Sequence, residues 1–369
     1  MVRKKCPYCD FNSYEMRGSA PGDSYIDALL RDLEYELLNI GSFDISSIYI
    51  GGGTPSLFTG EQIGRLLDGI RTTADVAAAA EITLEANPGA LEAARFGEYR
   101  DAGINRVSIG VQSLRDEQLT RLGRVHSAAE ATAAVAAALG AGFESVNVDL
   151  MYGLPGDRVD DALQDLTAAI ELGTPHLSWY QLTLEPNTAW EHRPPSGLPA
   201  DEVIAAIEET GRDMLSSAGL ERYEVSAYAK AGHQCAHNLN YWRFGDYAGI
   251  GAGAHSKRRT PDGGGYARYG RRRNPSSYAL AAGSAGGIET HDRVDDPAAI
   301  TLEYLMNALR LTEGTTLHAF EETTGVDSNQ VVSACAAARR AGLMSGDNDR
   351  LCASAAGYRQ LNRILRIID

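Results

Sequence analysis

The sequence predicts an α/β fold in which parallel strands alternate with helices. Short apolar runs rich in Ile, Val, Leu and Tyr recur through the first half of the chain, as is typical of buried strands. Between them lie stretches whose apolar residues return at helical spacing. Repeated alternation of strand and helix implies parallel strands joined by right-handed crossovers. A doubly wound sheet and a barrel both satisfy this pattern.

The positions of the apolar runs define the expected elements in order along the chain. The expected strands are Ser47–Ile50, Ile82–Ala86, Arg106–Val111, Ser145–Tyr152 and His176–Leu184. The expected helices beside them are Asp23–Ile40, Gly60–Thr72, Leu91–Ala102, Asp116–Leu122, Ala128–Leu139 and Asp160–Leu172. A small C-terminal helical module is expected from Leu302–Leu311, Leu317–Thr324, Ser328–Ala341 and Ala353–Ile368.

Polar or glycine-rich sequence follows the expected strands. These segments are Gly51–Pro55, Glu85–Gly89, Gln112–Ser113, Asp149–Asp157 and Glu185–Asn187. The carboxyl ends of parallel strands meet at one face, where α/β proteins keep their ligand sites. Because the interior of a parallel strand is normally apolar, Glu85, Gln112 and Asp149 favour a binding site over ordinary loop chemistry.

Cys6 and Cys9 lie three positions apart near the start of the sequence. Two thiolates at this spacing lie on one side of a tight loop and can reach a single metal centre. A [4Fe–4S] cluster that binds a substrate at its unique iron needs three protein thiolates. The other cysteines, Cys235, Cys335 and Cys352, are far away in sequence and are interpreted as small, partly buried apolar residues.

The composition excludes several classes of partner. The formal net charge of −15 and the pI near 5.0 oppose binding to nucleic acid or to anionic membranes. The sequence shows no apolar stretch of bilayer-spanning length, and its first residues lack the apolar core of a signal peptide. The five cysteines have irregular spacing, which fits a reducing compartment better than a disulfide framework. We therefore expect a cytoplasmic protein.

Several motifs occur in a fixed order along almost the whole chain. They are CPYCDFNS at Cys6, YIGGGTPS at Tyr49, LEANPG at Leu84, NRVSIGVQS at Asn105, VDLMYGLPG at Val148, HNLNYW at His237 and MNALRLTEG at Met306. In this order they closely resemble the radical-SAM heme chaperones, which are often labelled oxygen-independent coproporphyrinogen III oxidase-like proteins. One glycine motif alone would be weak evidence for this family, whereas the whole series of motifs in this order is strong evidence for it.

The resemblance implies a partial (β/α)6 barrel over residues 1–225, a His- and aromatic-rich connecting region over 226–300, and a small winged-helix-like domain over 301–369. It also implies a [4Fe–4S] cluster bound by Cys6 and Cys9, with S-adenosylmethionine across the strand ends. The residues that match the family's S-adenosylmethionine contacts are Gly52, Gly53, Thr54, Glu85, Gln112, Arg124 and Asp149. Glycines let the backbone approach the methionine part, and carboxylates suit ribose hydroxyls or the ammonium group.

The segment from Tyr223 to His255 is unusually dense in His, Tyr and Trp. Imidazole can coordinate heme iron, and aromatic rings can pack on a porphyrin plane. The family motif in this segment matches His237, Asn238, Tyr241 and Trp242. By that resemblance these residues are the heme candidates, with His237 the expected contact.

The chain departs from the family at the first cluster cysteine. That cysteine would lie four residues before Cys6, where this sequence has Val2. The fold and heme binding are expected to carry over despite the difference, whereas radical chemistry does not carry over without a test. The sequence therefore does not decide whether the chain is an enzyme.

Two functions follow from the resemblance. The first is a heme-binding chaperone that delivers heme to recipient proteins, with cluster and S-adenosylmethionine organising the site and heme as cargo. The alternative is an oxygen-independent coproporphyrinogen III oxidase-type enzyme that decarboxylates coproporphyrinogen III. The decarboxylases carry a further cysteine two positions after the last cluster cysteine, where this sequence has Phe11, so heme trafficking is favoured. The sequence does not identify the heme recipient, and a homodimer stays open.

Overall fold

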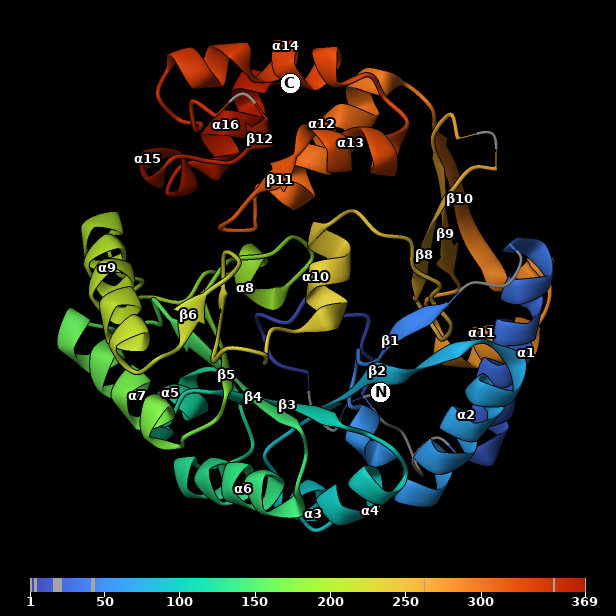
Figure 1. The fold of residues 1–369 in the computed structure, drawn as a ribbon. Coiled ribbons are helices and arrows are strands. Elements are labelled where there is room, and N and C mark those ends of the chain that lie inside the picture. The colour runs from blue at the N-terminus through green and yellow to red at the C-terminus, as the bar shows by residue number, and fades with distance from the viewer. Residues whose placement is uncertain are drawn as a thin grey trace. The chain divides into compact units, whose positions relative to one another are not determined.

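Five parallel strands with helices between them form the first part of the computed structural model (Figure 1). The structure describes residues 2, 5–15, 22–40, 44–261, 263–347 and 349–368, the side chains of residues 39 and 40 excepted. The parallel strands are β1 (Ile45–Ile50), β2 (Val76–Ala86), β3 (Arg106–Gln112), β4 (Ser145–Tyr152) and β5 (His176–Gln181). The predicted α/β fold is confirmed.

Two short antiparallel strands extend this sheet beyond β5. β7 (Ala227–Ala229) pairs with β5, and β6 (Glu221–Arg222) pairs with β7. The sheet therefore has seven strands in the order β1-β2-β3-β4-β5-β7-β6. Strands as short as β6 and β7 show no periodicity of their own, so sequence patterns do not predict them.

Helices cover the outer side of the sheet (Figure 1). The helical segments of this part are η1 (Pro55–Leu57), α2 (Gly60–Thr73), α3 (Ala90–Ala93), α4 (Phe96–Asp101), α5 (Asp116–Arg121), α6 (Ala128–Ala141), α7 (Val159–Glu171), α8 (Ala189–His192) and α9 (Asp201–Ser217). Capping boxes at Thr59 and Ser127 begin α2 and α6, because each side chain accepts a hydrogen bond from a free backbone amide of the first turn. At the other end of α6, Gly142 takes a left-handed conformation that stops the helix.

One predicted helix is wrong in detail. Residues 91–102 form two short helices, α3 and α4, with Arg95 between them. The Arg95 guanidinium donates hydrogen bonds to the carbonyls of Ser56, Leu57 and Phe58. These bonds hold Arg95 against the turn that follows β1 and interrupt a continuous helix.

One portion of the core of this part lies between the sheet and helices α7 and α9. It includes Leu150, Leu166, Leu177, Trp179 and Ile207, all of them buried. Gly211 of α9 faces Trp179, and a Cβ at this glycine would meet the indole ring at 2.0 Å. The close approach of helix and ring therefore requires a glycine.

The chain divides into two compact units. The first comprises Met1–Asp27, Phe43–Arg222 and Ser226–Gln234, and the second comprises Ala28–Ser42, Tyr223–Val225 and Cys235–Asp369. The second unit contains α10 (Ala236–Trp242), α11 (Pro275–Ala281) and an antiparallel sheet in the order β10-β9-β8. The strands of this sheet are β8 (His255–Arg259), β9 (Tyr266–Arg271) and β10 (Ile288–Val294).

Helices dominate the C-terminal part of the second unit. They are α12 (Pro297–Ala308), α13 (Leu317–Thr324), α14 (Ser328–Arg340), α15 (Ala355–Tyr358) and α16 (Leu361–Ile368), with a two-stranded pair β11 (Thr315–Thr316) and β12 (Arg350–Leu351). Two helices, α15 and α16, replace the single one predicted over residues 353–368. Tyr304 packs edge-on against Phe244 and Phe320 in the core of this unit.

A buried ion cluster ties α1 (Asp23–Ile40) to β9. Arg271 Nε lies 3.0 Å from Asp32, and its Nη2 pairs with Glu36. Tyr278 of α11 donates to Asp32 Oδ2 at 2.8 Å. The three charged side chains are almost completely buried, so each depends on the others for compensation of its charge.

None of the helices in the described part of the chain is long and apolar enough to cross a bilayer.

Candidate functional site

Glu85 lies at the carboxyl end of β2 and accepts two hydrogen bonds. The Tyr49 hydroxyl donates to Glu85 Oε1 at 2.5 Å, and the Gly52 amide donates to Oε2 at 3.0 Å. Burial raises the pKa of Glu85 to about 7. The hydrogen bonds oppose this rise and the negative charge of Asp149 adds to it. Glu85 is therefore a carboxyl group that changes protonation near neutral pH.

The glycine run after β1 exposes backbone beside this carboxyl group. Gly52 has a φ of +108°, which side chains rarely allow, and nothing lies within 4 Å of where its Cβ would be. A Cβ at Gly51 would meet the Tyr49 ring at 2.5 Å, so the contact between Tyr49 and Glu85 requires glycine there. Gly53 follows in the same loop and is half-buried.

Thr54 and Arg124 are linked through Asn87. The Asn87 amide donates to Thr54 Oγ1 at 3.2 Å, and Asn87 Oδ1 accepts from Arg124 Nη2 at 3.0 Å. Arg124 Nη2 also donates to the Gly110 carbonyl at 2.7 Å. These bonds join the loops that follow β1, β2 and α5 at one face of the sheet.

The guanidinium of Arg124 has a buried nitrogen that lacks a partner in the described part of the chain. Its Nε is buried and has no hydrogen-bond partner among the described residues. Leaving a charged donor buried and unpaired is costly, so the site fits an anionic ligand group such as a carboxylate. Arg124 Nη1 lies 3.8 Å from Cys6 Sγ, which places the cysteine loop beside the same guanidinium.

Gln112 ends β3 in a strained conformation. Its φ of +70° is rare for a residue with a side chain, and strain of this kind is concentrated at functional sites. Gln112 Oε1 accepts a hydrogen bond from the Tyr180 hydroxyl at 2.6 Å. Burial raises the pKa of Tyr180 well above its usual value, and Asp149 reinforces this increase. Tyr180 is therefore a neutral donor that fixes Gln112 near Asp149.

Asp149 is half-buried in β4, and its carboxyl group accepts hydrogen bonds from neighbouring side chains of the sheet. Its Oδ1 accepts from Asn147 Nδ2 at 2.7 Å, and its Oδ2 accepts from Ser108 Oγ at 3.2 Å. Burial raises the pKa of Asp149, and hydrogen bonds, that from Asn147 foremost, oppose the rise. On the other side, Asn147 Oδ1 accepts from His176 Nδ1 at 2.6 Å and from Ser178 Oγ at 3.1 Å.

Cys6 and Cys9 flank a tight turn that is anchored to α8. The Cys9 amide donates to the Cys6 carbonyl at 3.2 Å, and the Trp190 amide donates to the Pro7 carbonyl at 3.0 Å. The rings of Tyr8 and Trp190 lie 5.7 Å apart. Burial raises the pKa of the Cys9 thiol. The turn therefore presents two thiols from a fixed backbone.

No third cysteine is grouped with Cys6 and Cys9 among the described residues. Val2, at the position that the family pattern gives to the first cysteine, bridges to Glu15 and donates its amide to the Tyr14 carbonyl at 2.9 Å. No group of three or more His, Cys, Asp or Glu in the described part of the chain could hold a metal ion. These residues fit two ligands of a [4Fe–4S] cluster and do not complete the site.

The heme candidates lie on α10 in the second unit. The rings of His237 and Tyr241, one turn apart, meet edge to face with centroids 4.7 Å apart. Trp242 packs under the Arg310 guanidinium at 4.2 Å, and its Nε1 is buried without a hydrogen-bond partner among the described residues. Asn238 is half-buried on the same helix. A hydrogen-bond acceptor brought by a ligand would satisfy the indole N–H.

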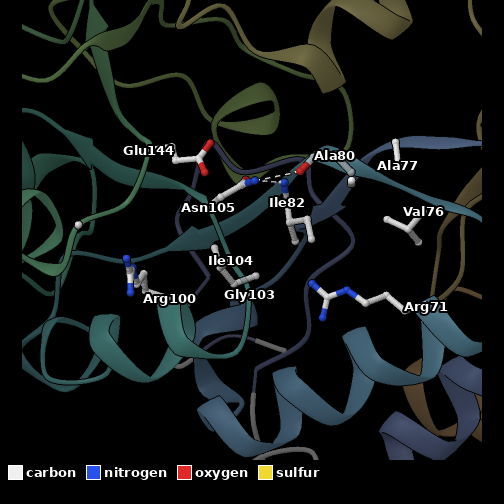
Figure 2. Close-up of a pocket in the computed structure, with 12 residues that line it drawn as sticks. Arg71, Val76, Ala77, Ala80, Ile82, Arg100, Gly103, Ile104, Asn105 and Glu144 are labelled. Atoms are coloured by element: carbon white, nitrogen blue, oxygen red, sulfur yellow. Dashed lines mark hydrogen bonds between the residues drawn. The ribbon is translucent and has the colours of Figure 1, made fainter.

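A cavity of about 540 Å³ lies at the opposite, amino-terminal end of the strands (Figure 2). Arg71 and Arg100 border it, and the Asn105 side chain closes one wall by bonding to the Ala80 carbonyl and the Ile82 amide. None of the predicted site residues lines this cavity. The candidate site is therefore the carboxyl rim and not this cavity.

Comparison with known proteins places the chain in a family. Residues 3–169 match the Radical SAM superfamily, and residues 295–359 match the HemN C-terminal domain. The heme chaperone HemW of Escherichia coli (strain K12) is 49% identical over 325 residues, which cover 88% of this chain and 84% of the relative. The chain belongs to the heme chaperone HemW family. HemW of Haemophilus influenzae is 48% identical over 332 residues, covering 89% of this chain and 85% of the relative.

A solved structure agrees with the fold of this HemW-family chain. Coproporphyrinogen III oxidase (HemN) from Escherichia coli superposes with a TM-score of 0.83, covering 100% of this chain and 88% of that one. The sequence identity is 22%, so this likeness shows the fold alone.

Most of the predicted S-adenosylmethionine contacts of this HemW-family chain lie at the carboxyl rim of the first unit. Contacts among side chains and backbone join Gly52, Thr54, Glu85, Gln112, Arg124 and Asp149 there. Sequence reasoning missed Tyr49, Gly51, Asn87, Asn147 and Tyr180, which hold these residues. A signal was present for Asn147, because it lies two positions before Asp149 and so faces the same side of β4.

Proposed function

We propose that this chain is a heme-binding chaperone that delivers heme to recipient proteins. The observation that carries the proposal is the 49% identity, over most of both chains, to a protein named heme chaperone HemW. Its partners are then heme and heme-accepting proteins, in a cytoplasmic setting. Fold likeness to a coproporphyrinogen III oxidase at 22% identity does not favour decarboxylation over heme transfer.

The heme contact is assigned to His237 on α10. The aromatic neighbours Tyr241 and Trp242 offer ring faces and an unpaired indole N–H beside it. An imidazole on a short helix can reach heme iron, while the surrounding rings shield the porphyrin from water. These features support α10 as the segment that binds the cargo.

Absorption spectroscopy with hemin tests the proposal. Purified protein is expected to shift the Soret band of hemin, and His237→Ala is expected to abolish or strongly alter the shifted band. His318→Ala is the matched control, because the side chain of His318 is 88% exposed on α13. A spectrum and affinity that are the same in native protein and His237→Ala would contradict histidine ligation by α10.

S-adenosylmethionine is the ligand proposed for the carboxyl rim. The buried, unpaired Arg124 Nε fits its carboxylate, and the open backbone at Gly52 and Gly53 fits its methionine part. Glu85 and Asp149 would accept from its ammonium group or ribose hydroxyls, as the family resemblance implies. Thr54 and Gln112 are the remaining residues proposed to contact S-adenosylmethionine. When bound, the ligand supplies a cationic sulfonium to a site that contains two carboxyl groups.

The iron–sulfur cluster does not follow from the proposed S-adenosylmethionine site. Cys6 and Cys9 are the ligands proposed for iron, but two thiolates do not complete a [4Fe–4S] site that binds S-adenosylmethionine at a free iron. We therefore assign no radical step to this chain. An anaerobic assay with coproporphyrinogen III, reductant and S-adenosylmethionine is expected to give no decarboxylation, and robust turnover would favour the oxidase-type function instead.

A further inference from the structure

A layer of polar side chains lies beneath Asp149 in the interior of the sheet. The strand registers pair Ser108 of β3 with Asn147 of β4, and Asn147 with His176 of β5. Ser108, Asn147 and His176 are 5%, 1% and 0% exposed. The inner layers of such a sheet are normally filled with branched apolar residues, and a buried polar layer is costly unless every member is satisfied. The layer therefore needs an explanation beyond packing.

The bonds of Asn147 define its orientation. An ionised Asp149 can only accept, so the atom of Asn147 that faces it at 2.7 Å is the donor Nδ2. Asn147 Oδ1 then faces His176 Nδ1 at 2.6 Å, and this nitrogen carries the proton. Burial lowers the pKa of His176 well below its usual value, in agreement with a neutral ring that has a single N–H. Asn147 thus has both donors and both acceptor sites occupied.

The same bonds fix the carboxylate of Asp149. Asn147 donates to one oxygen and Ser108 donates to the other, so both interior lone pairs are satisfied by donors. The Ser178 side chain is a further hydrogen-bonding neighbour of Asp149, and the lone pairs that these three residues leave are available to a ligand. A ligand that presents hydroxyl or ammonium donors therefore fits Asp149, whereas an acceptor does not.

Other charged and titratable groups act on Asp149 from neighbouring strands. Arg106 favours its ionised form, whereas Asp149 and Glu85 disfavour ionisation of each other. Tyr49 and Tyr180 lie close enough for the charge of Asp149 to oppose ionisation of both. Among these groups, Asn147 supplies the leading hydrogen bond that opposes the rise in the pKa of Asp149 on burial.

We propose that Asn147 is a positioning residue for the rim site: oriented by His176, it holds the carboxyl group of Asp149 as an acceptor for a hydroxyl- or ammonium-bearing ligand. The inference rests on the proposed binding of S-adenosylmethionine at this rim. Asn147 itself does not touch the ligand.

Calorimetric titration of the full chain with S-adenosylmethionine at several pH values tests the role. Asn147→Asp puts a second carboxyl group where the Nδ2 donor was, and the two carboxyl groups then share a proton. Affinity at neutral pH is expected to fall at least about tenfold, and the midpoint of the pH profile is expected to move upward by about one unit or more. His176→Leu removes the donor that orients Asn147 and is expected to weaken binding less, without adding a carboxyl group.

Asn105→Asp is the matched control. Asn105 is a half-buried asparagine whose amide also donates and accepts, but its partners are backbone groups of β2 beside the cavity at the amino-terminal end of the strands. Asn105→Asp is expected to lower the stability of the fold and to leave the pH midpoint of S-adenosylmethionine binding unchanged. A profile of Asn147→Asp that coincides with that of native protein would overturn the inference. If Asn147→Asp does not fold, native affinity in folded His176→Leu would overturn it equally. Absence of binding by native protein would instead refute the proposed rim ligand.

Discussion

The Tyr49 hydroxyl lies 2.5 Å from Glu85 Oε1 and joins the carboxyl ends of β1 and β2. The bond is possible because Gly51 leaves room for the tyrosine ring. Glu85 receives a second hydrogen bond from the Gly52 amide at 3.0 Å, so its carboxyl group is fixed before any ligand arrives. Preorganisation of this kind lowers the cost of ordering a site on binding.

The pKa of Glu85 predicts pH-dependent binding of S-adenosylmethionine. Burial raises this pKa to about 7, so a large part of the carboxyl groups is protonated just below neutral pH. A cationic ammonium group binds the ionised form, and affinity is therefore expected to fall as the pH decreases through about 7 and to level off about one unit above it. Calorimetry across this range measures the effect. Glu85→Gln is expected to bind weakly without the pH dependence, and a flat native profile would contradict the role of Glu85.

Asp149 is expected to contribute directly to the same affinity. Asp149→Ala removes a half-buried acceptor and leaves the Asn147 and Ser108 donors without it, which should weaken binding by about 1–3 kcal/mol. Asp160→Ala is a control because Asp160 is exposed at the start of α7. Unchanged affinity in folded Asp149→Ala would remove Asp149 from the site.

Iron content tests the incomplete cysteine set. After anaerobic reconstitution, the native protein is expected to hold substoichiometric or labile iron because Cys6 and Cys9 supply two thiolates. Val2→Cys is expected to raise the iron and sulfide content, whereas Val2→Ser lacks the thiolate and should not. Stable loading of native protein with about four iron atoms per chain would show that another donor completes the cluster.

Gly211 offers a test of the packing beneath the rim. A Cβ at this position would meet the Trp179 ring at 2.0 Å, so Gly211→Ala is expected to destabilise the fold by about 1–3 kcal/mol. Gly97→Ala is the control, since nothing lies within 4 Å of its Cβ position in α4. Urea unfolding compares the two. Equal stability of Gly211→Ala and native protein would mean that α9 can move away from Trp179 at no cost.

Some residues of the carboxyl rim could be predicted from the sequence because they interrupt the apolar pattern of the strands. Glu85, Gln112 and Asp149 are polar residues at or near the carboxyl ends of mainly apolar strands, and Gln112 also has a strained backbone. Arg124 breaks no pattern, since an arginine after a short helix has the character of a surface residue. Only the family resemblance assigned it a role. The Arg124 side chain points inward because it donates a hydrogen bond to the Gly110 carbonyl, a tertiary contact that no local periodicity encodes.

The sheet of the second unit could not be predicted for a different reason. The strand β8 has the sequence HSKRR, whose charges are typical of a solvated loop. In the structure Lys257 is buried over the Phe244 ring at 3.8 Å, and its Nζ donates to the Phe244 carbonyl at 2.8 Å. Burial lowers the pKa of Lys257 to about 8. Here tertiary contacts override local preference.

The ion cluster of Arg271 with Asp32 and Glu36 imposes an order on biosynthesis. Its partners are separated by 239 and 235 positions along the chain. A ribosome adds about 5–20 residues per second, so the two carboxylates emerge on the order of tens of seconds before their guanidinium. All strands of the parallel sheet emerge during that interval. The nascent chain can therefore complete its first unit while α1 still lacks its counterion, and the second unit closes only late in translation.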